Sequence, residues 1–383
     1  MTCTPSPIQA TSPGRPLSVA AVPSPVADLQ ENCRKCRKCV AACRVLDQNG
    51  TPGDIARSYD SSPVTVRRLA YSCSLCNLCQ QICPYDLAPS EMFLNLRQEA
   101  VSLGENHLRP HRRLLNYEWF GSNAIFRHLH LPVDCETIFY PGCALTGARP
   151  EETLKLYRLL QTVEPTIGIM LDCCNKPSHD LGRQQFFQKR FSARMQTLAK
   201  RNIRRIVTGC PSCLQAFSIL PHKFTITTAY SMLAGNVTLN PARFSGLTCS
   251  VHDPCSIRFA GTIHADVRSI CKALGLKLTE MVHNRENTFC CGEGGGVGFI
   301  DRKLSTEWNR KRVIEAEDQL LVTYCAGCTS QLRNHGNVHH LVDLLFADES
   351  NDKPIARTVT SLQSWRNRLM VKIRLMAARK KLQ

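Results

Sequence analysis

Long apolar runs are the first thing that the sequence lacks. No stretch of the 383 residues approaches the roughly 20 consecutive apolar residues of a membrane-spanning helix, so we expect none. We also expect no secretory signal peptide at the N-terminus. Residues 1–30 are rich in Pro, Ser, Ala and Thr with little charge. Because such a composition buries too little surface to become ordered, we expect a disordered leader over residues 1–30.

Motifs for nucleotides and flavins are missing as well. The glycine run Gly294–Gly296 lacks the Lys-Ser/Thr pair that follows a phosphate-binding loop, and it lacks the spacing of a dinucleotide fingerprint. The sequence therefore offers no flavin, nicotinamide or substrate site of its own.

Acidic residues are scarce in the C-terminal tail, residues 349–383, with none after Asp352. The apolar residues of the tail recur at helical intervals, and its basic residues lie largely on the other faces of that helix. Such a helix would suit an anionic membrane surface, but it would equally suit docking against a partner subunit or the protein's own core. The sequence leaves these alternatives open. The apolar face consists of Leu362, Trp365, Leu369, Ile373 and Met376.

Cysteine, in contrast, is abundant, with 22 in the chain. Disulfide frameworks belong to short secreted chains with small cores, whereas this chain is long and 43% of its residues are hydrophobic. Thiolates that bind a metal must stay reduced, so we expect the cytoplasm, and the inner face of the cell membrane if the tail binds lipid. The length also predicts two or three domains.

Eight of the cysteines form two runs with the spacing Cys-x2-Cys-x2-Cys-x3-Cys. This is the spacing of bacterial ferredoxins that hold two cubane [4Fe-4S] clusters, in which the fourth cysteine of each run serves the other cluster. The runs therefore predict a ferredoxin-like domain over residues 31–104. One cubane would be held by Cys33, Cys36, Cys39 and Cys83, and the other by Cys73, Cys76, Cys79 and Cys43.

A helix is predicted near the end of this domain, because Met92, Leu96 and Ala100 recur at helical spacing. We expect Ser90 to be its N-cap and Gly104 to be its C-cap. Residues 105–135 are interpreted as a linker packed on its neighbours. They mix basic and aromatic residues, but no nucleic-acid-binding motif accompanies them, so we expect no nucleic acid partner.

Ten further cysteines form two sets of a second kind, each with a lone cysteine, then an adjacent pair, then CxxC. Because corresponding cysteines lie at a nearly constant offset, the sets indicate two copies of one domain, which we place at residues 136–245 and 246–348. The first set is Cys143, Cys173, Cys174, Cys210 and Cys213. The second set is Cys255, Cys290, Cys291, Cys325 and Cys328.

Short apolar runs precede these cysteines, and amphipathic helical segments lie between them. This alternation predicts a parallel α/β sheet in each copy. In such sheets ligands gather beyond the carboxyl ends of the strands, so cysteines far apart in sequence would meet there. The expected strands are 137–140, 167–171, 205–208, 248–252 and 320–324, and the expected helices include 151–160, 184–200 and 263–274.

The number of cysteines favours iron over zinc, because a structural zinc site needs four ligands and each set of the second kind offers five. Adjacent cysteines make a strained disulfide, but they suit a cluster whose irons share a thiolate. His179, His252 and His335 lie near the motifs, and we expect them to be structural or to donate hydrogen bonds.

Four cysteines remain outside these sets. We expect Cys249 and Cys271 to be buried as small hydrophobic residues. Cys3 lies in the leader, and Cys135 is close enough in sequence to Cys143 to be an auxiliary thiol.

Several phrases carry a family resemblance, including Tyr140-Pro141-Gly142-Cys143, His252-Asp253-Pro254-Cys255 and Cys290-Cys291-Gly292-Glu293. Over residues 31 to about 345 the chain resembles the CCG-domain proteins of the heterodisulfide reductase B and D type. It is also similar to the C subunit of anaerobic glycerol-3-phosphate dehydrogenase and to the iron-sulfur subunits of glycolate and lactate oxidation. One departure is Asn175, which replaces the glycine of the first CCG.

The resemblance implies an α/β fold in which a helical two-cluster ferredoxin domain precedes two duplicated CCG domains. It also implies that each complete set of five cysteines holds a noncubane [4Fe-4S] cluster, giving one or two such clusters beside the two cubanes. Because of Asn175, we expect the second set to follow the family pattern more closely.

The function that we expect is that of an iron-sulfur electron-transfer subunit in an anaerobic or respiratory oxidoreductase complex. Because the chain has no flavin, nicotinamide or substrate site of its own, we expect a partner subunit, either a dehydrogenase or a flavoprotein. The chain would pass electrons from this partner toward a quinone or a thiol/disulfide couple. In the alternative, the chain itself is a disulfide reductase whose catalytic residues are Cys255, Cys290, Cys291, Cys325 and Cys328. A third hypothesis, from a different class, is a non-redox scaffold that binds zinc.

Overall fold

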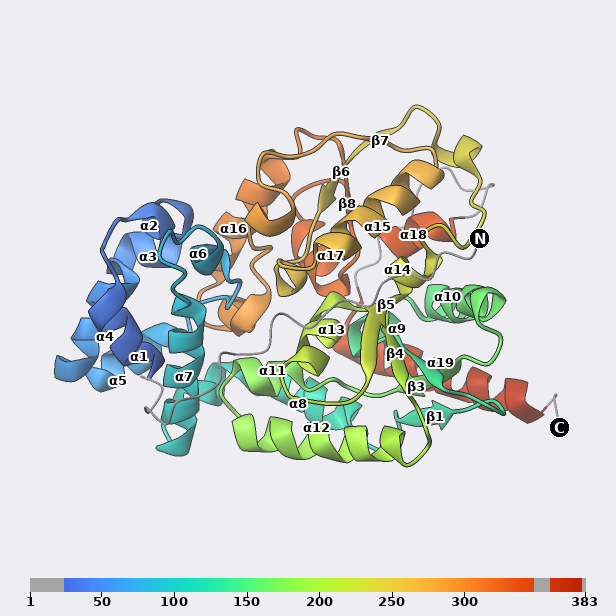
Figure 1. The fold of residues 1–383 in the computed structure, drawn as a ribbon, viewed down its shortest axis with the longest axis horizontal. Coiled ribbons are helices and arrows are strands. Elements are labelled where there is room, and N and C mark those ends of the chain that lie inside the picture. Colours follow the sequence, from blue (N-terminus) through green and yellow to red (C-terminus); the bar gives the residue numbers. More distant parts are fainter. Residues whose placement is uncertain (1–23, 348–358, 381–383) are drawn as a thin grey trace.

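The N-terminal part of the chain is a cluster of helices, drawn in blue at one end of the molecule in Figure 1. The computed structural model describes residues 24–347 and 359–380. Short connections and N-terminal prolines define these helices; the helix that begins at Pro52, for example, has a capping box between Thr51 and Asp54. The helices are α1 (Pro25–Asn32), α2 (Lys38–Ala42), α3 (Arg44–Asn49), α4 (Pro52–Ser61), α5 (Pro63–Ala70), α6 (Leu78–Gln81) and α7 (Pro89–Ser102).

Helix α1 corrects the expected leader. Residues 25–30, which we had assigned to the leader, lie in this helix, where Ser24 is the N-cap and Pro25 is the first helical residue. Val26 and Leu29 are buried in the core of the helical domain, and this burial holds the helix in place. The rest of the expected leader, with Cys3, lies outside the described residues apart from Ser24.

Helix α7 confirms one predicted cap and corrects the other. Gly104 has a φ of +71°, and the N–H groups of Gly104 and Glu105 bond to the carbonyls of Val101 and Ala100, as in a Schellman cap. Ser90 is not the N-cap, because the helix begins one residue before it at Pro89. Its hydroxyl instead donates to Asn77 Oδ1 at 2.5 Å.

The expected linker contributes regular structure of its own. It forms a 3-10 helix, η1 (Asn106–His111), helix α8 (Arg112–Gly121) and strand β1 (His128–His130). Strand β1 pairs antiparallel with β3 (Gly168–Leu171) at the edge of the first sheet. The linker is therefore part of the fold, and it makes the first sheet mixed, although we expected a parallel one.

The first sheet has the strand order β1-β3-β2-β4-β5, and all its pairs except β1-β3 are parallel. Its strands β2 (Thr137–Tyr140), β3 and β4 (Arg205–Thr208) match the predicted strands, and β5 is Thr225–Thr228. The connecting helices are α9 (Cys143–Ala148), α10 (Pro150–Val163), α11 (Lys176–Asp180), α12 (Gln184–Ala199), α13 (Pro211–Ser218) and α14 (Ala229–Leu233).

The second sheet repeats this arrangement in the order β7-β6-β8-β9, entirely in parallel. Strands β6 (Thr248–His252) and β8 (Leu320–Thr323) were predicted, whereas β7 (Lys277–Leu278) and β9 (Val338–His340) are short. Its helices are α15 (Gly261–Ala273), α16 (Arg302–Ile314), α17 (Ala326–Leu332) and α18 (Leu341–Leu345), and 3-10 turns η2 (Pro241–Phe244), η3 (Cys255–Ile257), η4 (Arg285–Asn287) and η5 (Gly294–Phe299) fill the loops.

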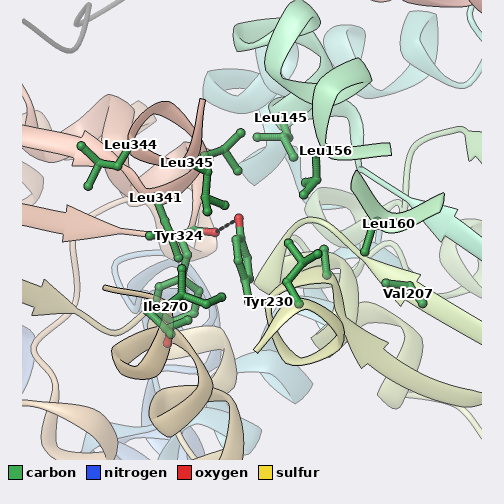
Figure 2. Packing of buried hydrophobic residues seen from close by; sticks show 14 of the residues in the cluster. Leu145, Leu156, Leu160, Val207, Tyr230, Ile270, Tyr324, Leu341, Leu344 and Leu345 are labelled. Carbon is green, nitrogen blue, oxygen red and sulfur yellow. Dashed lines mark hydrogen bonds between the residues drawn. The ribbon is translucent and has the colours of Figure 1, made fainter. Parts of the chain in front are cut away.

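One hydrophobic core joins the two sheets (Figure 2). Leu145, Leu156 and Val207 of the first half and Ile270 and Leu341 of the second half belong to the same buried cluster. At its centre Tyr230 stacks edge-on against Tyr324 and donates a hydrogen bond to its carbonyl at 3.5 Å. The two halves are thus packed together, and residues that follow strands of both sheets line one cavity.

The C-terminal helix α19 (Ser361–Lys380) docks on the protein's own core, which was one of the alternatives that the sequence left open. It packs against α9 and α10, and Val371 and Leu375 join the shared core. The predicted apolar face is not the buried one, because Leu362, Ile373 and Met376 are exposed. No helix among the described residues is long and apolar enough to cross a membrane.

Candidate metal centre

The structure gathers the ferredoxin-type cysteines into the two expected groups. Cys43, Cys73, Cys76 and Cys79 line one cavity of about 330 Å³. Cys33, Cys36, Cys39 and Cys83 line a second, smaller one, which Cys79 also touches. The fourth cysteine of each run therefore lies with the first three of the other, as the spacing predicts.

Because these thiols are buried and close together, their thiolate forms are disfavoured unless a cation neutralises them. Burial, followed by the neighbouring thiolates of Cys33 and Cys36, raises the pKa of Cys39 to about 12. Burial and the thiolate of Cys76 raise the pKa of Cys43 to about 11. Such groups need a positively charged iron core to become thiolates together, which is the chemistry of a cluster site.

The two five-cysteine sets meet at one large cavity of about 930 Å³ between the halves. Within the first set, Cys143 Sγ lies 3.8 Å from Cys173 Sγ. Across the cavity, the thiols of Cys210 and Cys325 are close enough to share a hydrogen bond. Four cysteines of each set line the cavity: Cys143, Cys174, Cys210, Cys213, Cys255, Cys291, Cys325 and Cys328.

Asn175 adopts the left-handed backbone conformation that the glycine of a CCG motif would have. Its φ of +62° and ψ of 22° place it in the left-handed region, where Asn is among the more tolerant residues. Gly292, at the corresponding position of the second set, has a φ of +82°. A Cβ atom there would lie 2.6 Å from the carbonyl oxygen of Ser305, so only the first half has room for a side chain.

The side chain of Asn175 is fully buried in a polar network. Its Oδ1 accepts from Arg194 Nη2 at 2.8 Å, and its Nδ2 donates to Glu118 Oε1 and Ser122 Oγ, both at 3.2 Å. Glu118 also accepts from the hydroxyl and the N–H of Ser178. The substitution therefore ties the first CCG loop to α8, the helix of the expected linker.

Two buried hydrogen-bond donors occupy equivalent positions in the two halves. Tyr140 and His252 both end the central strand of their sheet, three residues before the first cysteine of each set. Tyr140 packs with Cys174 and Cys213, and His252 lies with Cys291 and Cys328 in a group whose ligand atoms are within 4.8 Å of one another. Tyr140 Oη and His252 Nε2 have no hydrogen-bond partner in the described part of the chain.

The tautomer of His252 follows from its neighbour. Arg312 Nε donates to His252 Nδ1 at 2.9 Å, so Nδ1 is the acceptor and the hydrogen of a neutral ring is on Nε2. Burial and then the charge of Arg312 lower the pKa of His252 to about 3, so the ring is neutral. The Nε2–H group therefore faces the sulfurs of Cys291 and Cys328 as a donor, which agrees with the expected role of this histidine.

A buried arginine lies near each of the two five-cysteine sets. Arg194 bonds to the carbonyl of Cys173 and pairs with Asp172 at 3.3 Å, and Arg312 pairs with Glu315 at 2.7 Å. Among the described residues, Arg194 Nη1 and Arg312 Nη2 are left without a partner. Unpaired donors next to crowded thiols fit a group that is rich in sulfide and negative charge, so the residues fit an iron-sulfur cluster in each half.

Glu293 ends the phrase Cys290-Cys291-Gly292-Glu293, but the sequence analysis gave it no role at the site. It follows the second CCG and lines the large cavity between the halves. Its side chain is open to this cavity rather than packed in the core. The surrounding protein, followed by the thiolates of Cys325 and Cys290, raises the pKa of this carboxyl, so Glu293 holds a proton more readily than an ordinary glutamate.

Two other buried arginines fix the ferredoxin-like domain to the CCG halves. Arg97 donates to the carbonyls of Ala70 and Cys73 within its own domain, to Asp180 of the first half and to Gly295 of the second. Arg258 donates to the carbonyls of Cys76, Glu286 and Thr288. At this junction Cys290 of the second set lines the cavity of a ferredoxin-type group and lies within hydrogen-bonding reach of Cys76.

The remaining predicted residues, apart from His335, lie away from the cavities or make local contacts. Cys249 and Cys271 are fully buried in the shared core, as expected. Cys135 is buried and donates to the carbonyl of Thr137, a contact that uses its thiol locally. His179 pairs with Asp180 at 3.0 Å, and His335 lines the large cavity.

Two known protein families match consecutive parts of the chain. Residues 32–88 match a 4Fe-4S dicluster domain. Residues 137–218 and 249–333 match the cysteine-rich domain CCG. The two copies that were inferred from the cysteine offset are therefore two matches to one family.

Curated relatives resemble much of this chain at low identity. The chain is 22% identical over 307 residues to the EtfAB:quinone oxidoreductase of Syntrophomonas wolfei, covering 68% of this chain and 43% of that protein. It is 23% identical to an uncharacterized iron-sulfur protein of Methanocaldococcus jannaschii, covering 79% and 67%. It is 21% identical to the D subunit of the dihydromethanophenazine:CoB–CoM heterodisulfide reductase of Methanosarcina mazei, covering 73% and 75%. The chain thus spans less than half the length of the first of these relatives.

Proposed function

We propose that this iron-sulfur protein, which carries a 4Fe-4S dicluster domain and two CCG domains, is the electron-transfer subunit of a larger oxidoreductase. It would receive electrons from a dehydrogenase or flavoprotein partner and deliver them toward a quinone or a thiol/disulfide couple. When bound, the clusters supply one-electron redox chemistry. The residues of the chain hold them, set their charge environment and exclude water.

The observation that carries this proposal is that the four cysteine groups form one continuous series. Cys39 of the first ferredoxin-type group interacts electrostatically with Cys79 of the second. Cys76 of the second lies beside Cys290. Cys325 of the second CCG set faces Cys210 of the first. A series of neighbouring redox groups is the arrangement expected of an electron path.

The two ends of the series differ in exposure. Cys36 of the first ferredoxin-type group is exposed, and Arg34, Lys35 and Arg37 around it are exposed as well. All the cysteines of the CCG sets are buried except Cys143 and Cys255, which are half-buried. We therefore assign the entry of electrons to the end around Cys36, and their delivery to the large cavity between the CCG halves.

We assign two cubane clusters to the ferredoxin-type groups and a noncubane cluster to each CCG set, with the ligands as named above. Support for two CCG clusters comes from the paired donors Tyr140 and His252, which occupy equivalent places in the two halves. Iron and sulfide analysis of anaerobically purified protein tests this assignment. We expect about 16 iron atoms per chain for four [4Fe-4S] clusters, whereas zinc without visible charge-transfer absorption would establish the scaffold hypothesis.

A catalytic disulfide reductase is the second candidate. It is favoured by Glu293, an acid with a raised pKa whose side chain is open to the cavity that the two CCG sets share, where it can supply a proton. Two electrons and two protons convert one disulfide to two thiols, so a proton source beside two one-electron groups suits that chemistry.

Electron paramagnetic resonance separates the two candidates. A disulfide reductase should show a paramagnetic state of a CCG cluster that depends on added thiol and disappears in Cys291→Ser protein. An electron-transfer subunit should lack that state, and its reduced clusters should be reoxidised by a quinone analogue such as menadione. Thiol-dependent resonance without reoxidation by menadione would reject the leading proposal in favour of the second.

A further inference from the structure

Helix α19 brings one charged residue to the first CCG set from outside both matched domains. Arg368 is only 3% exposed and donates from Nη2 to the carbonyl of Gly121 at 2.6 Å. Its guanidinium carbon lies 5.8 Å from the ring centre of Tyr117 and 5.3 Å from that of Phe126. The matched CCG segments end at residue 333, so this residue is not part of the domain pattern.

The charge of Arg368 has no carboxylate partner. Among residues 24–347 and 359–380, no acidic group forms an ion pair with it, and its Nη1 makes no hydrogen bond. Arg194 and Arg312 differ, because each pairs with an acidic residue. A buried guanidinium without a counter-charge is costly, so something negative must compensate it when the protein is complete.

Helix α19 brings Arg368 to the two segments that carry Cys143 and Cys173. The helix packs against α9, which begins at Cys143. Arg368 bonds to Gly121, and the next residue, Ser122, accepts from Asn175 in the loop Cys173-Cys174-Asn175. Burial alone would lower the pKa of Arg368, but the thiolates of Cys143 and Cys173 and the phenol of Tyr117 raise it overall. Arg368 is therefore placed to face the group that those two cysteines hold.

The docking surface is shaped for this contact. A Cβ atom at Gly121 would lie 2.1 Å from Arg368 Nη1, and one at Gly147 would lie 2.0 Å from Ser364 Oγ. Asn367 Nδ2 donates to the carbonyl of Gly147 at 2.7 Å. The helices α8 and α9 thus lack a side chain at the two places where α19 approaches them most closely.

We propose that Arg368 is a positioning residue of the first CCG cluster, and that its fixed charge makes this cluster easier to reduce. The inference rests on the proposed function, since it requires a cluster on the first set. In the step concerned, the second CCG cluster loses one electron and the first gains it. No proton is needed, because the guanidinium stays charged and offsets the added negative charge.

The test compares midpoint potentials in the whole holoprotein, measured by redox titration monitored by electron paramagnetic resonance. The first-site signal is the one that is absent from Cys174→Ser protein. In Arg368→Gln we expect the equilibrium constant for reducing this cluster to fall at least tenfold, a shift of about 59 mV for one electron. Arg368→Lys should retain most of the wild-type potential, and the cubane signals should not move.

Arg366→Gln is the matched control, because Arg366 is exposed on the same helix. An unchanged first-site potential in Arg368→Gln would overturn the proposal. If Arg368→Gln loses the first cluster while Arg368→Lys keeps it, the charge is needed to hold the cluster, which supports the proposal. If both variants lose it while Arg366→Gln does not, the role is packing and the proposal fails. A wild-type protein with no first-site cluster would instead refute the proposed function.

Discussion

Arg258 Nε donates a hydrogen bond of 2.8 Å to the carbonyl oxygen of Cys76, a residue 182 positions earlier in the chain. Arg258 follows Cys255 of the second CCG set, and Cys76 belongs to a ferredoxin-type group. The contact therefore joins the two kinds of site at the point where Cys76 and Cys290 lie side by side.

Replacing Arg258 with Met should uncouple these two domains. The change leaves the carbonyls of Cys76, Glu286 and Thr288 without their donor, and we expect the free energy of unfolding to fall by at least about 2 kcal/mol. Urea unfolding measures this loss. Arg310→Met, an exposed site on α16, serves as the control and should change stability by less than about 0.5 kcal/mol. Equal effects of the two variants would contradict the role of Arg258.

Replacing Tyr140 with Phe should affect the holoprotein and the apoprotein differently. Because Tyr140 Oη has no partner in the described part of the chain, its loss should not lower the stability of the cluster-free protein. A hydrogen bond from this hydroxyl would be stronger to the more negative, reduced cluster than to the oxidised one, so the first-site potential should fall when it is lost. Redox titration and urea unfolding measure the two effects.

Tyr157→Phe provides the matched control. Tyr157 Oη donates to the carbonyl of Ile167 at 3.0 Å, so this variant should lose about 1 kcal/mol of stability and leave the cluster potential unchanged. The interpretation of Tyr140 fails if Tyr140→Phe destabilises the apoprotein as Tyr157→Phe does.

Replacing Asn175 with Gly should show what the side chain contributes, because glycine accepts the same left-handed backbone. The change removes three hydrogen bonds and leaves buried groups of Glu118 and Arg194 with fewer partners, so the free energy of unfolding should fall by about 1–3 kcal/mol. Asn202→Gly is a suitable control, since Asn202 has a φ of +57° but is exposed. A gain of stability in Asn175→Gly would disprove the network argument.

Replacing Glu118 with Gln should alter the dependence of stability on pH. Burial, and then the thiolate of Cys173, raise the pKa of Glu118 to about 7 from its ordinary value of 4.5. The folded protein therefore binds this proton more tightly than the unfolded chain, and the protein loses stability as the pH rises from about 4.5 to about 7. Gln carries no charge, so Glu118→Gln should gain stability relative to the wild type over that range.

Urea unfolding of the holoprotein at pH 5, 6, 7 and 8 measures this difference. The advantage of the variant should grow up to about pH 7 and then level off. Parallel curves for the two proteins would mean that Glu118 titrates normally.

Cysteine spacing predicted most of the candidate site, because the spacing of cluster ligands is strict. In the CCG halves, strands also lie directly before Cys143, Cys173, Cys210, Cys255 and Cys325. The spacing could not reveal Arg97, Arg258 or Arg368, whose contacts reach across domains at sequence separations that no local pattern records. Ser90 was wrongly predicted to be an N-cap. A serine hydroxyl can bond to another side chain as well as to a helix N-terminus, and here it donates to Asn77 Oδ1. The prediction of the buried face of the tail was wrong, because that face of α19 includes the polar residues Ser364 and Arg368 as well as Val371 and Leu375.

The core around Tyr230 and Tyr324 has a further consequence. If two identical subunits met through such a core, every mutation would appear on both sides of the interface at once. Because both halves lie in one polypeptide, each can diverge alone, and they have done so: Tyr140 stands opposite His252, and Asn175 opposite Gly292. Because the two halves are covalently joined, their two sites can acquire different residues and take on different roles.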